Sequence, residues 1–289
     1  MMLRAVSQRF GFKSLVALGF FSLAGIYLFA TRPVALQAEQ TSGRTVPVEM
    51  VFRVVAAEND AARKLWTADI VGVGGKVGLK FDEKWREPAM EAGPLPALFL
   101  REASTALQKT RVPLGLFLGS DFPIAQPNKF SGAQADHFAN LRKTGEPEFF
   151  NAADIGRYTA IFPDRAVAPG CVTCHNEHPN SPKTDWKLND IMGATTWSYP
   201  KERVTLEELV QIVAALRSSF GAAYDAYLTK VATFSKPPEI GDKWPADGYF
   251  IPSKRAFLAE FERRASPNTV QRLLLTVAEA KKSPDSPRR

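Results

Sequence analysis

The sequence predicts an α+β fold, because two different hydrophobic periods alternate along the chain. Apolar residues recur every three to four positions in segments that we expect to be helical: 48–71, 96–109, 132–143 and 205–234. Short apolar, aromatic or β-branched runs predict strands: 112–118, 157–162 and 194–199. An apolar fraction of 45% over 289 residues is enough for a core of ordinary size.

The helix boundaries follow from local signals. The first helix is expected to end at the glycine-rich stretch 72–75, because glycine is a poor helix former. The helix from Thr205 has the clearest start, since Thr205 and Glu208 match a capping box. A segment rich in Pro and Gly, 236–256, is expected to cross the surface, with helical patterns following at 257–261 and 269–280.

These elements give a predicted domain organisation. It begins with a signal-anchor or signal peptide (1–32) and a linker (33–47). The main domain (48–235), a C-terminal extension (236–280) and a disordered tail (281–289) follow. The tail is short, charged and poor in apolar residues, which is typical of disorder.

The first segment has the pattern of an export signal. Arg4, Arg9 and Lys13 precede an uncharged, mainly apolar run over 15–30. Cleavage after Ala38 would place Leu36 at the −3 position, where signal peptidase sites have small residues. We therefore expect an uncleaved membrane anchor. The alternatives are a cleaved signal peptide and a buried core helix. The anchor or the signal peptide would place the main domain on the periplasmic side of a bacterial inner membrane.

The charge distribution argues against nucleic acid as a partner. The net charge is +7, but residues 1–32 carry four basic residues and no acidic one, and 281–289 contribute a further +3. The remaining residues are neutral overall, whereas a nucleic-acid-binding domain needs a basic face of its own. The oligomeric state does not follow from the sequence.

One motif carries chemistry. Cys171-Val172-Thr173-Cys174-His175 has the C-x-x-C-H pattern of c-type haem attachment. In that chemistry two thiols add to the vinyl groups of one haem, and the adjacent histidine becomes an axial iron ligand. Export is consistent with this interpretation, because c-type haem is attached outside the bacterial cytoplasm.

Three other interpretations of the motif were considered. A structural zinc site needs about four ligands, and the pair supplies two thiolates. A thioredoxin-like pair opens a helix after a strand, whereas this pair follows Pro169-Gly170 and precedes a Pro-rich loop. A simple disulfide would not require His175, so haem attachment is the preferred interpretation.

The motif and the residues after it also resemble a known family. The stretch Cys171-Val-Thr-Cys-His-Asn-Glu-His-Pro-Asn-Ser-Pro-Lys-Thr-Asp-Trp186, followed by Asn189-Asp190-Ile-Met-Gly-Ala194, is similar to a PAS-like c-type haem domain family. Members occur as extracytoplasmic sensor portions of bacterial signalling proteins and as stand-alone proteins. The resemblance covers about 50–235 and is densest over 112–200. It implies a PAS-like antiparallel sheet flanked by helices, a long helix after the sheet, and one covalent haem c at Cys171, Cys174 and His175.

The second axial position is left open by the sequence. Some family members are thought to use a cysteine from the N-terminal helix as the distal ligand, but the matching stretch here, 59–63, has none. An open or water-bound site is the leading interpretation, with Met192 the named protein alternative. Further candidates were considered, each with a simple structural role as the alternative: His137, His178, Met50 and Met90.

Other residues near the motif have two interpretations each. Lys183, Lys187 and Arg165 suit the carboxylates of haem propionates, or they are solvated loop residues. Trp186 and Trp197 pack on the porphyrin or fill the core. Asp164 and Asp185 are expected to be turn residues rather than catalysts.

Three function classes follow from one haem motif. The first is a sensor of redox state or of a small gas, which passes its signal to a separate partner protein, because the chain shows no kinase signature or phosphate-cradling glycine loop. The second is a periplasmic electron-transfer cytochrome. The third is a haem peroxidase-like enzyme, for which His137 is the candidate distal acid–base residue. The sensor is the preferred interpretation, and a catalytic role is not expected.

Overall fold

The computed structural model describes residues 45–246, 248 and 250–282. The predicted segment 1–32, most of the linker 33–47 and residues 283–289 of the predicted tail lie outside these ranges. Within them, no helix has the length and apolar character needed to span a membrane. The fold mixes helices with small, mostly antiparallel sheets, so the predicted α+β class is confirmed.

The first predicted helix is longer than expected. It comprises α2 (Val48–Lys64), a π-helical segment η2 (Leu65–Gly72) and α3 (Val73–Lys76). The predicted break at 72–75 is wrong, because the helix passes through these glycines. At Gly74 a Cβ would lie 3.0 Å from a Leu79 methyl group and 3.3 Å from the Phe81 ring. The glycine therefore permits close packing at a place where its low helix propensity predicted an end.

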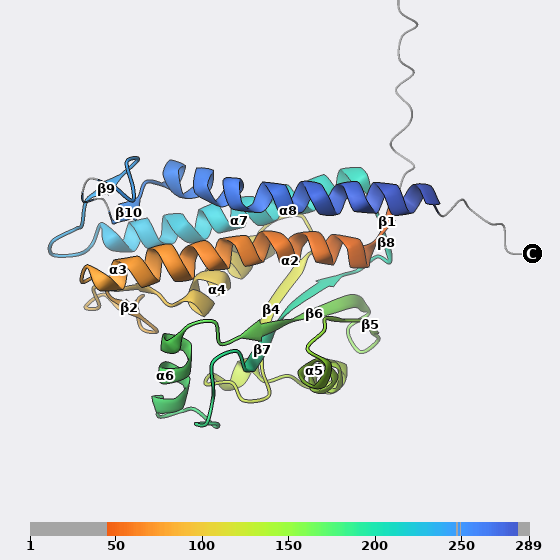
Figure 1. The fold of residues 1–289 in the computed structure, drawn as a ribbon, viewed down its shortest axis with the longest axis horizontal. Coiled ribbons are helices and arrows are strands. Elements are labelled where there is room, and N and C mark those ends of the chain that lie inside the picture. The colour runs from red at the N-terminus through yellow and green to blue at the C-terminus, as the bar shows by residue number, and fades with distance from the viewer. Residues whose placement is uncertain (1–44, 247, 249, 283–289) are drawn as a thin grey trace, which may run out of the picture. The chain divides into compact units, whose positions relative to one another are not determined.

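Two long helices pack beside α2. The helix α7 (Leu206–Val231) begins with the predicted capping box, in which Thr205 accepts a hydrogen bond from the Glu208 backbone and Glu208 reaches back to the Thr205 backbone. The helix α8 (Lys254–Lys282) runs alongside α2 and α7 (Figure 1). The helix α4 (Pro96–Gln108) packs against α7 and matches the helix predicted at 96–109.

The C-terminal helix α8 corrects two expectations. It is one helix rather than two short ones, and it includes Pro267. Proline costs a helix one backbone hydrogen bond, but Phe257, Phe261 and Ala265 before it and Thr269 after it are buried. Packing on both sides thus outweighs the local proline signal. The helix also includes residues 281–282 of the segment predicted to be disordered.

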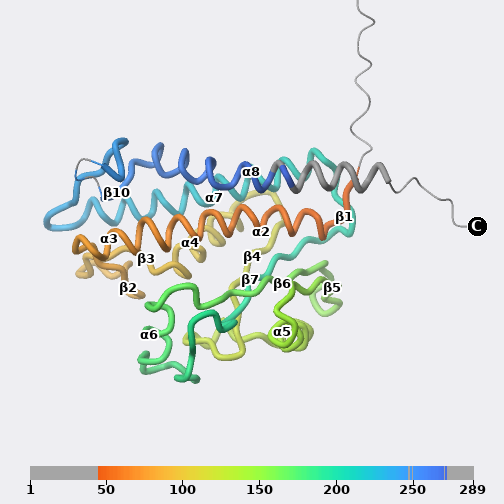
Figure 2. Tube along the Cα trace, viewed as in Figure 1, coloured from red at the N-terminus to blue at the C-terminus, as the bar shows by residue number. Residues whose placement is uncertain are grey.

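The central sheet has four antiparallel strands in the order β4-β7-β6-β5. The strands β4 (Gly115–Gly119), β6 (Arg157–Arg165) and β7 (Ile191–Tyr199) overlap the three predicted strands. The strand β5 (Glu148–Ala152) was not predicted. One face of the sheet packs under α2, and the other packs against α5 (Gly132–Thr144) (Figure 2).

Alternation along the strands creates these two faces. On β6, Ala160 belongs to the large core shared with the helices, whereas Ile161 belongs to a smaller core under α5. On β7, Trp197 belongs to the large core and Ala194 to the smaller one. Trp197 is therefore a core residue, fully buried among the helices.

Short pairings complete the fold. An antiparallel pair joins β1 (Thr45–Pro47) to β8 (Arg203–Thr205), which brings the start of α2 next to the start of α7. Two further pairs are parallel and lie in loops: β2 (Phe81–Asp82) with β3 (Gly93–Pro94), and β9 (Ile240–Gly241) with β10 (Ile251–Pro252). The remaining elements are a 3-10 turn η3 (Gln126–Asn128) and the helix α6 (Pro169–Glu177).

A buried carboxylate on α2 forms an ion pair with α7 and a hydrogen bond with α8. The Glu58 carboxylate on α2 has no exposed surface and accepts hydrogen bonds from Arg217 Nε at 2.9 Å and Arg217 Nη2 at 2.7 Å on α7. The Thr269 hydroxyl on α8 donates a third at 2.5 Å. One carboxylate therefore joins three helices that are far apart in the sequence.

Candidate functional site

The cysteine motif lies in the connection between two central strands. After β6 the chain leaves the sheet, forms α6 and a loop, and returns at β7 (Figure 1). The Asn189 N–H donates to the Ala166 carbonyl and the Ala166 N–H to the Asp190 carbonyl, both at 2.9 Å. These bonds close the base of the connection, so residues 167–188 form an excursion anchored to the sheet.

The helix α6 places the three motif side chains together. Cys171, Cys174 and His175 are at positions i, i+3 and i+4, which share one face of an α-helix. Both thiols are free, Cys171 half-buried and Cys174 exposed. The helix begins with Pro169 in its first turn, where a missing N–H costs nothing. The sequence did not predict this helix.

The half-buried His175 ring makes no hydrogen bond with the described residues. Its Nδ1 atom is buried and has no partner among the described residues. Burial lowers the pKa of His175, while the Asp164 carboxylate partly opposes the shift by favouring the charged ring. At neutral pH the imidazole is therefore uncharged, which is the form that binds metals.

The Cys174 thiol is also kept neutral. Burial raises its pKa first, and the Glu83 carboxylate raises it further. A thiol with a raised pKa is mostly protonated at neutral pH, so Cys174 does not have the low pKa of a thioredoxin-type nucleophile.

An ion pair from two distant elements lies beside the motif. Arg63 on α2 donates to Asp164 on β6, and 24% of each side chain is exposed. The pKa of Arg63 is raised: burial lowers it, but Asp164 and, more weakly, Cys171 raise it by more. Because Asp164 also acts on His175, the pair links α2 to the motif. Asp164 is a strand residue, not the turn residue that the sequence predicted.

The loop after α6 folds back onto the helix. The Asn176 side chain donates to the Trp186 carbonyl at 3.0 Å and accepts from the Trp186 N–H at 2.9 Å. The Trp186 ring is 4% exposed and meets Phe122 edge to face. Trp186 thus closes the loop onto the domain next to the motif.

The three basic candidates differ in what they contact. Lys183 pairs with Asp185 and lies 4.7 Å from the centre of the Trp186 ring. Arg165 donates to the Asn189 carbonyl at 3.2 Å, at the base of the excursion. Lys187 is exposed.

The candidate distal histidines are both occupied. His178 makes a hydrogen bond through Nε2 with Glu83 at 3.2 Å, and its Nδ1 accepts from the Asn180 N–H at 3.1 Å. His137 on α5 stacks on Phe150 at 3.8 Å and pairs through Nδ1 with Glu148 at 3.1 Å. Figure 1 shows α5 well separated from α6.

Met192 occupies an irregular position in the sheet. Asp164 pairs with Gly193 and Arg165 with Ile191, so Met192 is left in a β-bulge at the base of the excursion. Such bulges redirect a side chain and occur next to functional sites. Met192 is half-buried there, as are Met50 in the first turn of α2 and Met90 between β2 and β3.

Sequence reasoning missed the residues that fix the motif in space. Asn176 follows the motif directly, but its partner lies ten residues later. Asn59 begins the stretch 59–63, which was described only as lacking a cysteine. Its side chain is 4% exposed, and its Oδ1 has no partner among the described residues. Arg63 lies one turn further along α2 on the same face.

The comparisons with known proteins address the same region. No curated protein and no solved structure matches the chain. Residues 50–200 match the Tll0287-like family (Tll0287). The match covers just over half of the chain and includes α2, the central sheet and the motif. The chain therefore belongs to the Tll0287-like family.

Proposed function

We propose that this protein is a mono-haem c-type protein with a PAS-like domain over 48–235. Thioether bonds from Cys171 and Cys174 would hold the haem, and His175 would be an axial ligand. The observation that carries the proposal is the arrangement on α6, where two free thiols share one face with a half-buried, neutral imidazole whose buried Nδ1 has no partner among the described residues. These donors suit a covalently attached haem, and the family is one of PAS-like c-type haem domains.

The surrounding residues would position the group. The bonds from Asn176 to Trp186 hold the loop on α6, so the Trp186 ring is placed as a wall of the site. Lys187 is the exposed cation available to a propionate, while Lys183 contributes through its position over Trp186. Met192 is the protein side chain we propose for the distal position if the iron takes a second protein ligand. The bound haem would supply reversible one-electron redox chemistry and an iron that binds small gases.

We propose sensing of redox state or of a small gas as the function, and the helix contacts support it. Arg63 joins α2 to Asp164 beside the motif. The same helical run pairs with α8 through Glu58 and through Asp69, which accepts from Arg264 at 2.8 Å. A change at the motif would thus reach α8 through one continuous helical run. The recipient would be a separate signalling or redox protein, on the periplasmic side of a membrane to which the N-terminal segment anchors this chain.

Electron transfer is the second candidate, and one observation favours it. No residue of α6 is fully buried, so the motif lies at the protein surface. A haem attached there would have an exposed edge, which suits electron exchange with a partner. The peroxidase-like alternative loses its candidate residue, because His137 is engaged with Glu148 and Phe150 and its helix α5 lies well apart from α6 (Figure 1).

Ligand binding distinguishes the two candidates. The protein would be produced in a host competent for c-type haem maturation, and its absorption spectrum recorded oxidised, reduced and reduced with CO. We expect a covalent c-type spectrum that shifts with CO, because a sensor needs an accessible iron. A low-spin spectrum that CO does not change would reject gas sensing and favour the electron-transfer cytochrome.

A further inference from the structure

A second candidate binding site lies at the start of α2. It is a cavity of about 200 Å³ between the first turn of α2 and the strands β5 and β6. None of its lining residues belongs to α6, so it is distinct from the cysteine motif. The inference drawn from it goes beyond the proposed haem function and does not depend on it.

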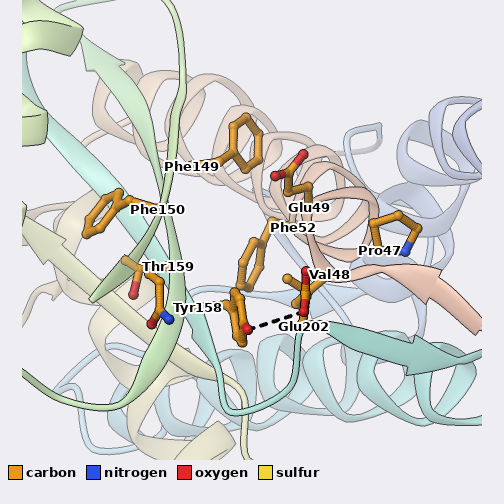
Figure 3. A pocket seen from close by; sticks show the side chains of 10 residues that line it. Pro47, Val48, Glu49, Phe52, Phe149, Phe150, Tyr158, Thr159 and Glu202 are labelled. Carbon is orange, nitrogen blue, oxygen red and sulfur yellow. Dashed lines mark hydrogen bonds between the residues drawn. The ribbon is translucent and has the colours of Figure 1, made fainter. Parts of the chain in front are cut away.

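Aromatic rings form much of the wall. Phe52 from α2, Phe149 from β5 and Tyr158 from β6 line the cavity on the side of the sheet that faces α2 (Figure 3). The Phe150 ring points to the other side of the strand, as the figure also shows. Aromatic rings attract cations through their faces. The protein already uses this here, since the Arg53 guanidinium lies 4.6 Å from the centre of the Phe149 ring.

Two carboxylates lie in the same wall. Glu202 accepts a hydrogen bond from the Tyr158 hydroxyl at 3.4 Å (Figure 3). Glu49 is exposed in the first turn of α2 and has no hydrogen bond or ion pair within the described part of the chain. The cavity therefore combines aromatic faces with two carboxylates that no cation in the described part of the chain pairs with directly.

None of the nearby cations on the described part of the chain pairs with Glu49 or Glu202. Lys201 pairs with Glu208 at the start of α7. Arg203 donates to the Thr45 hydroxyl at 2.8 Å and the Thr45 carbonyl at 3.0 Å. Arg53 lies over the Phe149 ring at the cavity wall and makes no ion pair with either carboxylate within the described residues. An occupant that brings its own positive charge would be the natural complement.

We propose that this cavity binds a compact organic cation, such as a quaternary ammonium compound or a small amine. The cation would lie against Phe52, Phe149 and Tyr158, with Glu49 and Glu202 beside it. A cavity of about 150 Å³ holds a benzene molecule, so the volume of about 200 Å³ admits a ligand of about ten non-hydrogen atoms or fewer.

The test compares a cation with its uncharged isostere. Choline, phenethylamine and 3,3-dimethyl-1-butanol, which has the shape of choline without its charge, would be titrated into the full-length purified protein by calorimetry. We expect saturable binding of at least one cation and binding of the neutral alcohol weaker by about tenfold. The double variant E49Q/E202Q should weaken cation binding by a similar factor of about ten.

The matched control is E239Q. It removes one exposed carboxylate from a segment that does not line the cavity and should leave binding unchanged. Circular dichroism of each variant confirms that it is folded. No saturable binding of either cation would overturn the proposal. So would equal binding of the neutral alcohol, or cation binding that E49Q/E202Q does not change.

Discussion

The buried ion pair between Glu58 and Arg217 allows a sharp prediction about stability. Replacing one partner of a buried pair costs about 3–5 kcal/mol, because the other charge is left behind. The two partners differ here in what would remain. The Glu58 side chain is 0% exposed, whereas 28% of the Arg217 side chain is exposed.

The cost should therefore depend on which partner is removed. Arg217→Met leaves a carboxylate with no solvent contact and only the Thr269 hydroxyl, so we expect a loss of about 5 kcal/mol in the free energy of unfolding. Glu58→Met leaves a guanidinium that can reach water, so we expect about 3 kcal/mol. The double variant E58M/R217M should recover much of the loss, because an apolar pair often replaces a buried ion pair at little cost.

Urea denaturation followed by far-ultraviolet circular dichroism measures these differences, with all variants in the same haem state. The order of stabilities is the informative result: wild type, then the double variant, then Glu58→Met, then Arg217→Met. Equal losses for the two single variants, or a double variant whose loss is the sum of both, would refute the reasoning from burial.

Three further predictions follow from single side chains. Asn176→Ala removes both hydrogen bonds to the Trp186 backbone. We expect the free energy of unfolding, measured by urea denaturation, to fall by about 2 kcal/mol, and the ratio of haem to protein absorbance to fall as well. An unchanged ratio would show that this loop does not affect haem attachment. The hydrogen bond from Arg263 lowers the pKa of Glu260 to about 2, from the ordinary value of 4.5. The Glu260 carboxylate thus stabilises the fold above pH 4.5 and loses this effect as the pH falls toward 2. The melting temperatures of wild type and Glu260→Gln should therefore converge between pH 4.5 and pH 2. A difference that stays constant over this range would contradict the lowered pKa of Glu260. His178→Ala should leave the absorption spectrum unchanged, because both ring nitrogens already have protein partners; a changed spectrum would make His178 an iron ligand.

The features that the sequence predicted well depend on local signals. The capping box at Thr205 and Glu208 is complete within four residues, and it starts α7 as expected. The motif at 171–175 is likewise local, and its haem-binding role stays a prediction; the structure places its three side chains on α6. The predicted strands that overlap β6 and β7 were found because Thr, aromatic and β-branched residues cluster in them, and the one that overlaps β4 because a short apolar run ends at turn residues.

The features that were missed depend on tertiary contacts. The helix α6 has no fully buried residue, so it carries no apolar stripe that predicts a helix. The ion pair between Arg63 and Asp164 joins residues that are 101 positions apart. Pro267 predicts a break in α8 that packing against α2 prevents. In each case the deciding partner lies elsewhere in the chain.

The central claim is covalent haem attachment at Cys171 and Cys174, and peptide mass spectrometry tests it most directly. Protein from a host competent for c-type maturation would be digested under denaturing conditions, and the peptide containing Cys171–His175 weighed. We predict that this peptide carries the mass of one haem and that a C171A/C174A variant carries none. A haem-free wild-type peptide, from cells that attach haem to a control cytochrome c, would contradict the account.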